Sequence, residues 1–268
     1  MPPTAQQIVV ILGAGPGLGF GLAKVFSSVG HPVALLSRSL PRLEELAEQL
    51  NSDPLGKDGV VRGRARAYQV DATKEDSIRS AFGRFETDFQ SEKGHEGARV
   101  HTGIFNPGGG FFMSGLLETK PEQLESAFLS QTMGGFLFSR AVVEAIKSRP
   151  DFGAKPSEEA FGNILISGAT ASLRGSKKLS AFAASKCGLR AIAQSAAREF
   201  HPEGIHVAHF IIDGLIVTER TDKMLGTNYE SGTRMDTNDI AQVYLDVSRQ
   251  KKSAWTHEID LRPFSETF

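Results

Sequence analysis

The chain has 268 residues, with 30 lysines and arginines against 31 aspartates and glutamates, so its formal net charge is −1. Hydrophobic residues make up 40% and charged residues 23%, a composition that excludes wholesale disorder, collagen and coiled coil. The balanced charge also argues against a nucleic-acid-binding protein, in which a basic excess is typical. The length suits one domain, which we expect to span residues 1–268.

A single cysteine, Cys187, excludes an intramolecular disulfide and a multi-cysteine zinc site, and we expect this thiol to be buried and inert. The spacing of His206 and His209 matches no metal motif. No apolar run approaches the roughly 20 residues of a membrane span, and the first run, 8–12, follows no basic leader. The sequence therefore predicts a cytoplasmic protein without a membrane, nucleic-acid or metal partner.

Short β-rich runs alternate with longer helical patterns along the whole chain. The expected strands are 8–12, 32–37, 64–70, 100–105, 163–167, 206–212 and 255–261. The expected helices are 18–29, 41–49, 73–89, 121–148, 179–200 and 239–248, and the weakly periodic stretch 218–237 is expected to be a mobile lid. This alternation predicts an α/β fold, a Rossmann-type doubly wound parallel sheet in a three-layer αβα arrangement.

A glycine-rich turn joins the first strand to the first helix. Its residues are Gly13, Ala14, Gly15, Pro16, Gly17, Leu18 and Gly19. Glycines let the backbone turn tightly and approach a pyrophosphate, while the helix N-terminus offers unpaired N–H groups to the phosphates. The turn therefore predicts nucleotide binding by Gly13, Gly15, Gly17, Leu18 and Gly19.

The second strand ends in Ser37, Arg38 and Ser39. NAD-binding folds carry an acidic residue at this point, which binds the ribose 2′-hydroxyl. Here Arg38 can instead bind a 2′-phosphate through paired hydrogen bonds, with Ser37 beside it. The alternative is a solvated arginine at a strand end. We expect NADP(H) as the cofactor.

Together these features resemble the short-chain dehydrogenase/reductase family, over nearly all of the chain. The family's Gly-x-x-x-Gly-x-Gly turn matches Gly13, Gly17 and Gly19. The resemblance implies further cofactor contacts after the third, fourth and sixth strands, from Asp71, Ala72, Asn106, Gly108, Gly214, Ile216 and Thr218. Asp71 would meet the adenine or cap the next helix, Asn106 would be mainly structural, and Thr218 would touch the carboxamide.

The family's catalytic residues are largely replaced in this sequence. The resemblance implies hydride transfer at the nicotinamide, with a tyrosine moving the proton, a lysine four residues later, a serine and an asparagine. Phe182 stands at the tyrosine position and Lys186 keeps the lysine, while Ala169 and Gln131 stand at the serine and asparagine positions. Loss of a general acid lowers a rate by about 10²–10⁴.

Three hypotheses follow from this pattern. In the first, the protein reduces a small, largely apolar carbonyl or imine compound by a non-standard proton route, with Lys186, Thr170, Asp213 and Gln131 as catalytic candidates. An iminium carbon needs no proton, whereas a carbonyl needs a donor such as Asp213, Thr170, Lys186, His209 or solvent. In the second, the pocket performs isomerase- or cyclase-type chemistry with NADP(H) as a scaffold. In the third, the chain is a catalytically silent NADP(H)-binding subunit.

Two further expectations come from the family resemblance and the apolar residues. Divergent fungal members of the family in secondary metabolism offer similar departures from the catalytic pattern. Helices 121–148 and 179–200 would form a homodimer or homotetramer. An apolar substrate pocket is expected from Phe111, Phe112, Met113, Leu173, Met224 and Leu225.

Overall fold

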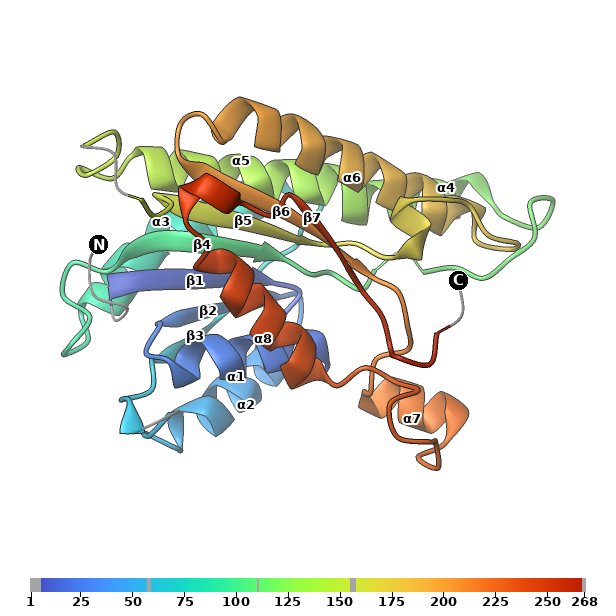
Figure 1. The fold of residues 1–268 in the computed structure, drawn as a ribbon, viewed down its shortest axis with the longest axis horizontal. Helices are drawn as coiled ribbons and strands as arrows, with labels where there is room; N and C mark the ends of the chain where they lie inside the picture. Colours follow the sequence, from blue (N-terminus) through green and yellow to red (C-terminus); the bar gives the residue numbers. More distant parts are fainter. Residues whose placement is uncertain (1–5, 57–58, 110, 155–157, 267–268) are drawn as a thin grey trace.

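Seven parallel strands form one twisted sheet in the computed structural model, which describes residues 6–56, 59–109, 111–154 and 158–266. The strands are β1 (Gln7–Leu12), β2 (Val33–Ser37), β3 (Ala65–Gln69), β4 (Arg99–Phe105), β5 (Gly162–Ser167), β6 (Ile205–Ile212) and β7 (Glu258–Leu261). Their order is β3-β2-β1-β4-β5-β6-β7, so the chain changes direction across the sheet between β1 and β4 (Figure 1). Ligands of such folds gather at the carboxyl ends of the strands, at this switch point.

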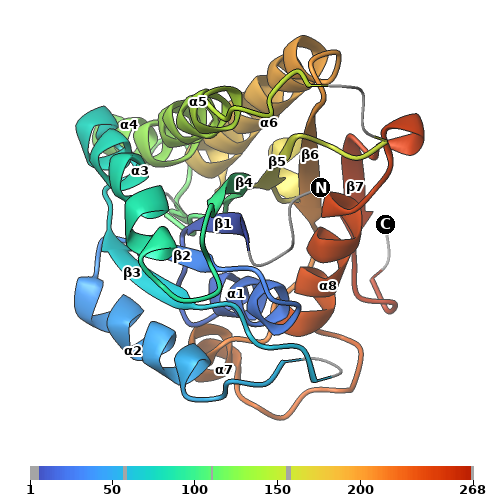
Figure 2. The ribbon, with the colours of Figure 1, turned by 90° about the vertical axis from the view of Figure 1, so that its left-hand side faces the viewer.

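Helices cover both faces of the sheet, which confirms the doubly wound α/β prediction (Figures 1 and 2). The helices are α1 (Leu18–Ser28), α2 (Leu40–Asn51), α3 (Glu75–Gln90), α4 (Pro121–Phe128), α5 (Gly134–Lys147), α6 (Ser180–Phe200), α7 (Glu219–Leu225) and α8 (Thr237–Ser248). The core residues of α3, α5 and α6 pack on one face, and those of α1, α2 and α8 pack on the other. Among the described residues, no helix has both the length and the apolar character that crossing a bilayer requires.

The central strand explains why the sheet is rigid at its carboxyl edge. Side chains of a strand alternate between faces, and β1 sends Ile8 and Val10 into one core and Val9 and Ile11 into the other. All four are fully buried, and each contributes about 1.5–3 kcal/mol when removed from water. The loops that follow the strands are therefore held on a fixed frame.

The helical stretch expected at 121–148 is present from 121 to 147, but it contains a π-helical turn, η3 (Leu129–Met133), between α4 and α5. Two other local expectations were wrong. The last strand begins at Glu258, since Trp255 instead stacks on His206 at a ring-centroid distance of 4.7 Å. Cys187 is exposed, because successive residues of α6 point about 100° apart and its neighbour Lys186 takes the buried side.

Candidate active site

The glycine turn after β1 is held tightly by the neighbouring strand ends. Gly13 has φ of +93°, and a Cβ at this residue would lie 2.4 Å from the backbone carbonyl atoms of Asn106. The N–H groups of Gly13 and Ala14 both donate to the carbonyl of Leu36, at 2.8 and 3.1 Å. A Cβ at Gly19 would lie 2.4 Å from the Gly13 oxygen, so both glycines are required by close backbone packing.

The other side of the turn is open. A Cβ at Gly15 would meet nothing within 4 Å, while one at Gly17 would lie 2.9 Å from Cγ2 of Thr218. Among the described residues, the N–H groups of Gly17, Leu18 and Gly19 have no hydrogen-bond partner, and the Leu18 side chain is buried in the core. Unpaired N–H groups at a helix N-terminus, beside glycines without side chains, fit a nucleotide pyrophosphate.

Arg38 stands at the carboxyl end of β2 with its guanidinium exposed. This group makes no hydrogen bond or ion pair within the part of the chain that the structure describes. The backbone is instead fixed, because the Arg38 carbonyl accepts a hydrogen bond from Nε2 of Gln69 at 3.0 Å. The neighbouring Ser37 is half-buried, and its carbonyl accepts from the N–H of Val70 at 2.8 Å. Because the backbone is fixed and the guanidinium has no partner among the described residues, Arg38 is well placed to bind an anion from solution.

Asp71 organises the turn after β3. Its Oδ1 accepts from the N–H and the hydroxyl of Thr73, at 3.0 and 2.8 Å, and the backbone hydrogen bond holds the pKa of Asp71 below its usual value. The alternative role as a helix cap is wrong, because α3 begins at Glu75 with Lys74 as its capping residue. The next residue, Ala72, packs against α5, where a Cβ at Gly134 would lie 3.0 Å from the Ala72 oxygen.

Asn106 and Gln131 both bind the backbone of loops. The Asn106 N–H donates to the Leu12 carbonyl at 2.8 Å, and its Nδ2 donates to the Gly13 carbonyl at 3.2 Å. Gln131, fully buried in η3, donates from Nε2 to the carbonyls of Pro107 and Gly109, at 2.9 and 2.6 Å. Gly108, between them, is exposed and has open space around it. Both amides therefore hold loops at the carboxyl edge, and the hydrogen bonds of Gln131 run to the loop after β4.

Lys186 crosses from α6 to the end of β5. Its Nζ donates to the carbonyl of Ser167 at 2.9 Å, its one acceptor among the residues described here. The side chain is buried, and burial lowers the pKa of Lys186 to about 8. The ring of Phe182 lies one helical turn earlier, 5.9 Å from Nζ, and meets the Phe111 ring edge-on at 5.2 Å. The amine is therefore flanked by aromatic rings that carry no proton donor.

Thr170 and Asp213 come together at the ends of β5 and β6. The Thr170 hydroxyl donates to Oδ1 of Asp213, and Nη1 of Arg262 lies 2.8 Å from Oδ2. Arg262 also binds Asp260 through two hydrogen bonds of 2.9 and 3.0 Å. Both oxygens of the Asp213 carboxylate therefore have a donor. Sequence reasoning missed Arg262, since nothing in the order of residues indicates that β7 brings it back to this edge.

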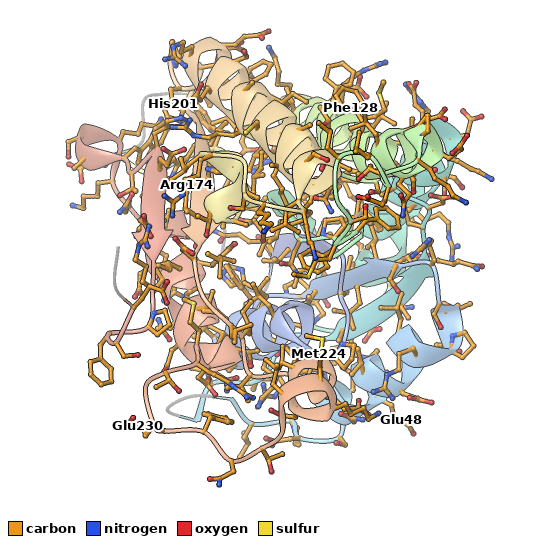
Figure 3. The ribbon with its side chains drawn as sticks, turned by 90° about the vertical axis from the view of Figure 1, so that its right-hand side faces the viewer. Glu48, Phe128, Arg174, His201, Met224 and Glu230 are labelled. Atoms are coloured by element: carbon orange, nitrogen blue, oxygen red, sulfur yellow. The ribbon has the colours of Figure 1, made fainter. Side chains whose placement is uncertain are left out.

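The segment after Asp213 packs closely and leads into α7. A Cβ at Gly214 would lie 2.6 Å from Cδ of Pro263, and the Ile216 carbonyl accepts from the Thr221 hydroxyl at 2.7 Å. The Thr218 hydroxyl accepts from the N–H of Thr221 at 3.2 Å and so caps α7. Figure 3 looks onto this edge and places Met224 of α7 opposite Arg174 of the loop after β5.

His209 is buried behind the edge, beside an ion pair that the sequence did not reveal. Its Nδ1 lies 3.0 Å from Oε2 of Glu258, and Arg190 binds the same carboxylate through two hydrogen bonds of 2.6 and 2.8 Å. Burial is the main cause that lowers the pKa of His209 to about 4. A Cβ at Gly168 would lie 2.2 Å from Nε2 of His209, so the backbone of Gly168 covers this ring.

A comparison with protein families finds one that matches most of this chain. The model of the short chain dehydrogenases covers residues 7–227, most of the chain. The chain belongs to this family. It is therefore a member of an oxidoreductase family with a Rossmann-type fold.

Other members of the short-chain dehydrogenase family align with nearly the whole chain. A short-chain dehydrogenase from Rhodopseudomonas palustris is 30% identical, with a TM-score of 0.74 over 97% of this chain and 99% of that one. A short-chain oxidoreductase from Pseudomonas aeruginosa, described as containing an atypical catalytic center, has a TM-score of 0.79 at 17% identity, covering 99% of both chains. The 3-oxoacyl-[acyl-carrier-protein] reductase of Bos taurus is 23% identical over 241 residues, which cover 88% of this chain and 89% of that protein.

Proposed function

We propose that this protein is an NADP(H)-dependent reductase of a small, largely apolar carbonyl or imine compound. The observation that carries the proposal is the open glycine turn, where the N–H groups of Gly17, Leu18 and Gly19 have no partner among the described residues. The guanidinium of Arg38, at the end of the next strand, has no partner among the described residues and could bind a 2′-phosphate. This supports NADP(H) as the cofactor. The Pseudomonas aeruginosa relative has also been solved with NADPH bound.

Each part of the edge would have a separate task. The glycine turn would hold the pyrophosphate, Arg38 the 2′-phosphate, Asp71 the adenine and Lys186 the nicotinamide ribose. Residues Ala72, Asn106, Gly108, Gly214, Ile216 and Thr218 would complete the walls of the cofactor site. The cofactor, when bound, supplies a hydride.

An apolar substrate is supported by the surface around this edge. Large apolar side chains stay exposed on the loops after β4, β5 and β6, namely Phe111, Met113, Leu173, Leu215, Met224 and Leu225. The mutual contact of the Phe111 and Phe182 rings extends this apolar surface toward Lys186. Apolar side chains of this kind would hold a substrate by excluding water from it.

A second candidate function is an NADP(H)-binding protein without redox activity, either a silent subunit or an isomerase-type enzyme. The observation in its favour is that Phe182 has no hydroxyl and that Thr170 already donates its proton to Asp213. Under this alternative the cofactor would bind as tightly as before. Its nicotinamide would not be oxidised by any substrate.

A homodimer or homotetramer in the cytoplasm is the setting that we expect. The exposed Phe136 of α5 lines a groove of about 540 Å³ together with Ile192 and Phe200 on α6. A second copy of the chain would cover these apolar groups. Light scattering on the purified protein should give twice or four times the mass of 28.9 kDa, and a monomer would contradict this expectation.

The experiment is a titration with NADPH and NADH, followed by incubation with ketones and imines. Tighter binding of NADPH, with loss of its absorbance in the presence of a ketone or imine, would support the reductase. Tight binding without oxidation would favour the second candidate. No binding of either nucleotide would overturn both.

A further inference from the structure

We infer that Lys186 itself donates the proton that completes carbonyl reduction, a role that rests on the proposed function. The other catalytic candidates at the carboxyl edge direct their protons to partners within the protein. Lys186 differs from them, because only one of its N–H groups has an acceptor among the described residues.

The Thr170 hydroxyl and the Asp213 carboxylate are already bound to each other. The proton of Thr170 points to Oδ1 of Asp213, and Oδ2 of the same carboxylate faces Arg262 at 2.8 Å. Because each oxygen of this carboxylate accepts from a donor, Asp213 offers no proton to a substrate. Thr170 could release its proton only if this hydrogen bond were broken.

The amide of Gln131 and the imidazole of His209 already have partners as well. Nε2 of Gln131 donates to the carbonyls of Pro107 and Gly109. Because a carboxylate only accepts, Glu258 fixes the neutral His209 ring with its proton on Nδ1, and Nε2 then carries none. The ring is fully buried, and the backbone of Gly168 stands in front of it.

The three tyrosines of the chain do not replace the missing hydroxyl either. Tyr68 donates to Asp88 at 3.1 Å, beside α3. Tyr244 is buried on the opposite face of the sheet, stacked on Phe210 and bonded to the Ser167 hydroxyl at 2.8 Å. Tyr229 is exposed in the segment after α7, where Arg234 lies over its ring.

Lys186 differs from all of these groups. An ammonium has three N–H donors, and one of them points to the Ser167 carbonyl, so two remain, one for the nicotinamide ribose and one for a substrate oxygen. The amine sits at the end of β5, buried but 5.9 Å from the ring of Phe182 that faces the apolar surface. The titratable groups on the packed elements are His209 on β6, Glu258 on β7 and Arg190 on α6, and Glu258 pairs with both His209 and Arg190. Burial brings the pKa of Lys186 to about 8, so the amine is still mostly protonated at neutral pH but gives up its proton readily.

The step balances without a further reagent. As hydride reaches the carbonyl carbon, the π pair of the C=O bond moves to the oxygen, which takes a proton from Nζ of Lys186. The neutral amine then regains a proton from water, so each alcohol formed consumes one NADPH and one proton. An iminium substrate accepts hydride alone and does not need Lys186 as an acid.

The decisive variant is Lys186→Arg, which keeps the positive charge and hydrogen-bond donors but cannot lose a proton near neutral pH. Lys186→Met, which removes the ammonium, is the second variant in case the larger guanidinium prevents folding, and thermal melts select the folded ones. Both variants should also bind NADPH more weakly, so rates are compared at saturating NADPH. Ketone reduction should then fall by about 10²–10⁴, and the ratio of the ketone rate to the iminium rate should fall by at least about 10². Phe182→Tyr added to Lys186→Arg should restore ketone reduction.

A readout without turnover tests the same claim. In cofactor-free protein with ¹³C-labelled lysine side chains, the resonance absent from Lys186→Arg identifies Lys186, and we expect it to titrate near pH 8 instead of at the ordinary lysine value of 10.5. Titration of this resonance at the ordinary value, unchanged ketone reduction in both Lys186 variants, or a wild type that reduces iminium ions but no ketone would overturn the inference. Failure of the wild type to bind or oxidise NADPH at all would instead overturn the proposed function.

Discussion

The two halves of the carboxyl edge differ in what they have left to offer a ligand. In the half built by β1, α1 and β2, backbone N–H groups and the guanidinium of Arg38 have no partner among the described residues. In the half built by β5, α6 and β6, the polar groups of Thr170, Asp213 and His209 are bound to one another or to neighbouring side chains. The first half is arranged to bind an anion. In the second half these three polar groups are paired within the protein, whereas Lys186 has one acceptor, the Ser167 carbonyl, and N–H groups to spare.

This contrast separates two tasks that one family usually combines. Binding a dinucleotide depends on backbone geometry, whereas moving a proton depends on a few side chains. A chain can therefore keep its dinucleotide-binding backbone and change its proton-transfer residues without changing its fold. Each of the following predictions concerns one half of the carboxyl edge.

The half of the carboxyl edge built by β1, α1 and β2 is called the nucleotide half below. The largest effect on the protein is expected from Gly13→Ala in this half. The new Cβ would lie 2.4 Å from the Asn106 backbone at a φ of +93°, so the free energy of unfolding should fall by at least about 3 kcal/mol. Gly15→Ala is the matched control, because its Cβ meets nothing within 4 Å. Urea unfolding of both variants checks the prediction, and equal stability would show that the turn is not held as described.

How far the sequence predicts this molecule also differs between the halves. The burial of β1 and the need for glycine at position 13 follow from local patterns, an apolar run and a turn beside a helix. The links of Asp213 to Arg262 and of His209 to Glu258 join residues 49 positions apart. Such pairs depend on strand order and register, which no local pattern specifies.

The π turn η3 illustrates the same limit. The apolar spacing of 121–148 is that of a continuous helix, yet five residues change their hydrogen bonding and place Gln131 in the interior. The extra residue of a π turn changes the phase of the side chains without a clear signature in composition. The sequence names Gln131 as a catalytic candidate, whereas its hydrogen bonds to the loop after β4 are visible only in the structure.

The next largest effect concerns the half of the carboxyl edge built by β5, α6 and β6. Phe182→Tyr should raise the rate of ketone reduction by about 10²-fold, because a phenol would gain a place beside Lys186. Phe111→Tyr is the control, since it adds the same hydroxyl to the ring that contacts Phe182 from the loop after β4. An equal gain in both variants, or none in either, would mean that the tyrosine position was assigned wrongly.

Arg38→Ala should weaken NADPH binding by about 10- to 100-fold, as expected from the loss of hydrogen bonds to a charged group. NADH binding should change little, because NADH has no 2′-phosphate. Arg42→Ala serves as the control, since Arg42 already forms an ion pair with Glu45 at 2.7 Å. Fluorescence titration of each variant with both nucleotides measures the effect, and equal losses for NADPH and NADH would remove the case for the 2′-phosphate.

The smallest effect concerns acid stability in the nucleotide half. Burial lowers the pKa of His31 from 6.5 to about 4, so between these values the unfolded chain binds a proton that the folded protein does not. The free energy of unfolding must therefore fall as the pH drops from 6.5 toward 4. His31→Asn, which can keep the hydrogen bond to the Gln7 carbonyl, should reduce this fall by about 1–2 kcal/mol. Urea unfolding at pH 7 and pH 4.5 gives the comparison, and an unchanged pH dependence would contradict it.

The most direct test of the central contrast is a single-turnover comparison of two substrates in the wild-type protein loaded with NADPH. One is an iminium ion and the other is the ketone of the same ring skeleton, and nicotinamide absorbance follows both. If the nucleotide half works while proton delivery depends on a lone lysine, the iminium ion should oxidise NADPH at least about tenfold faster than the ketone. Oxidation by the ketone at the same rate, or bound NADPH that the iminium ion leaves unchanged, would contradict the account.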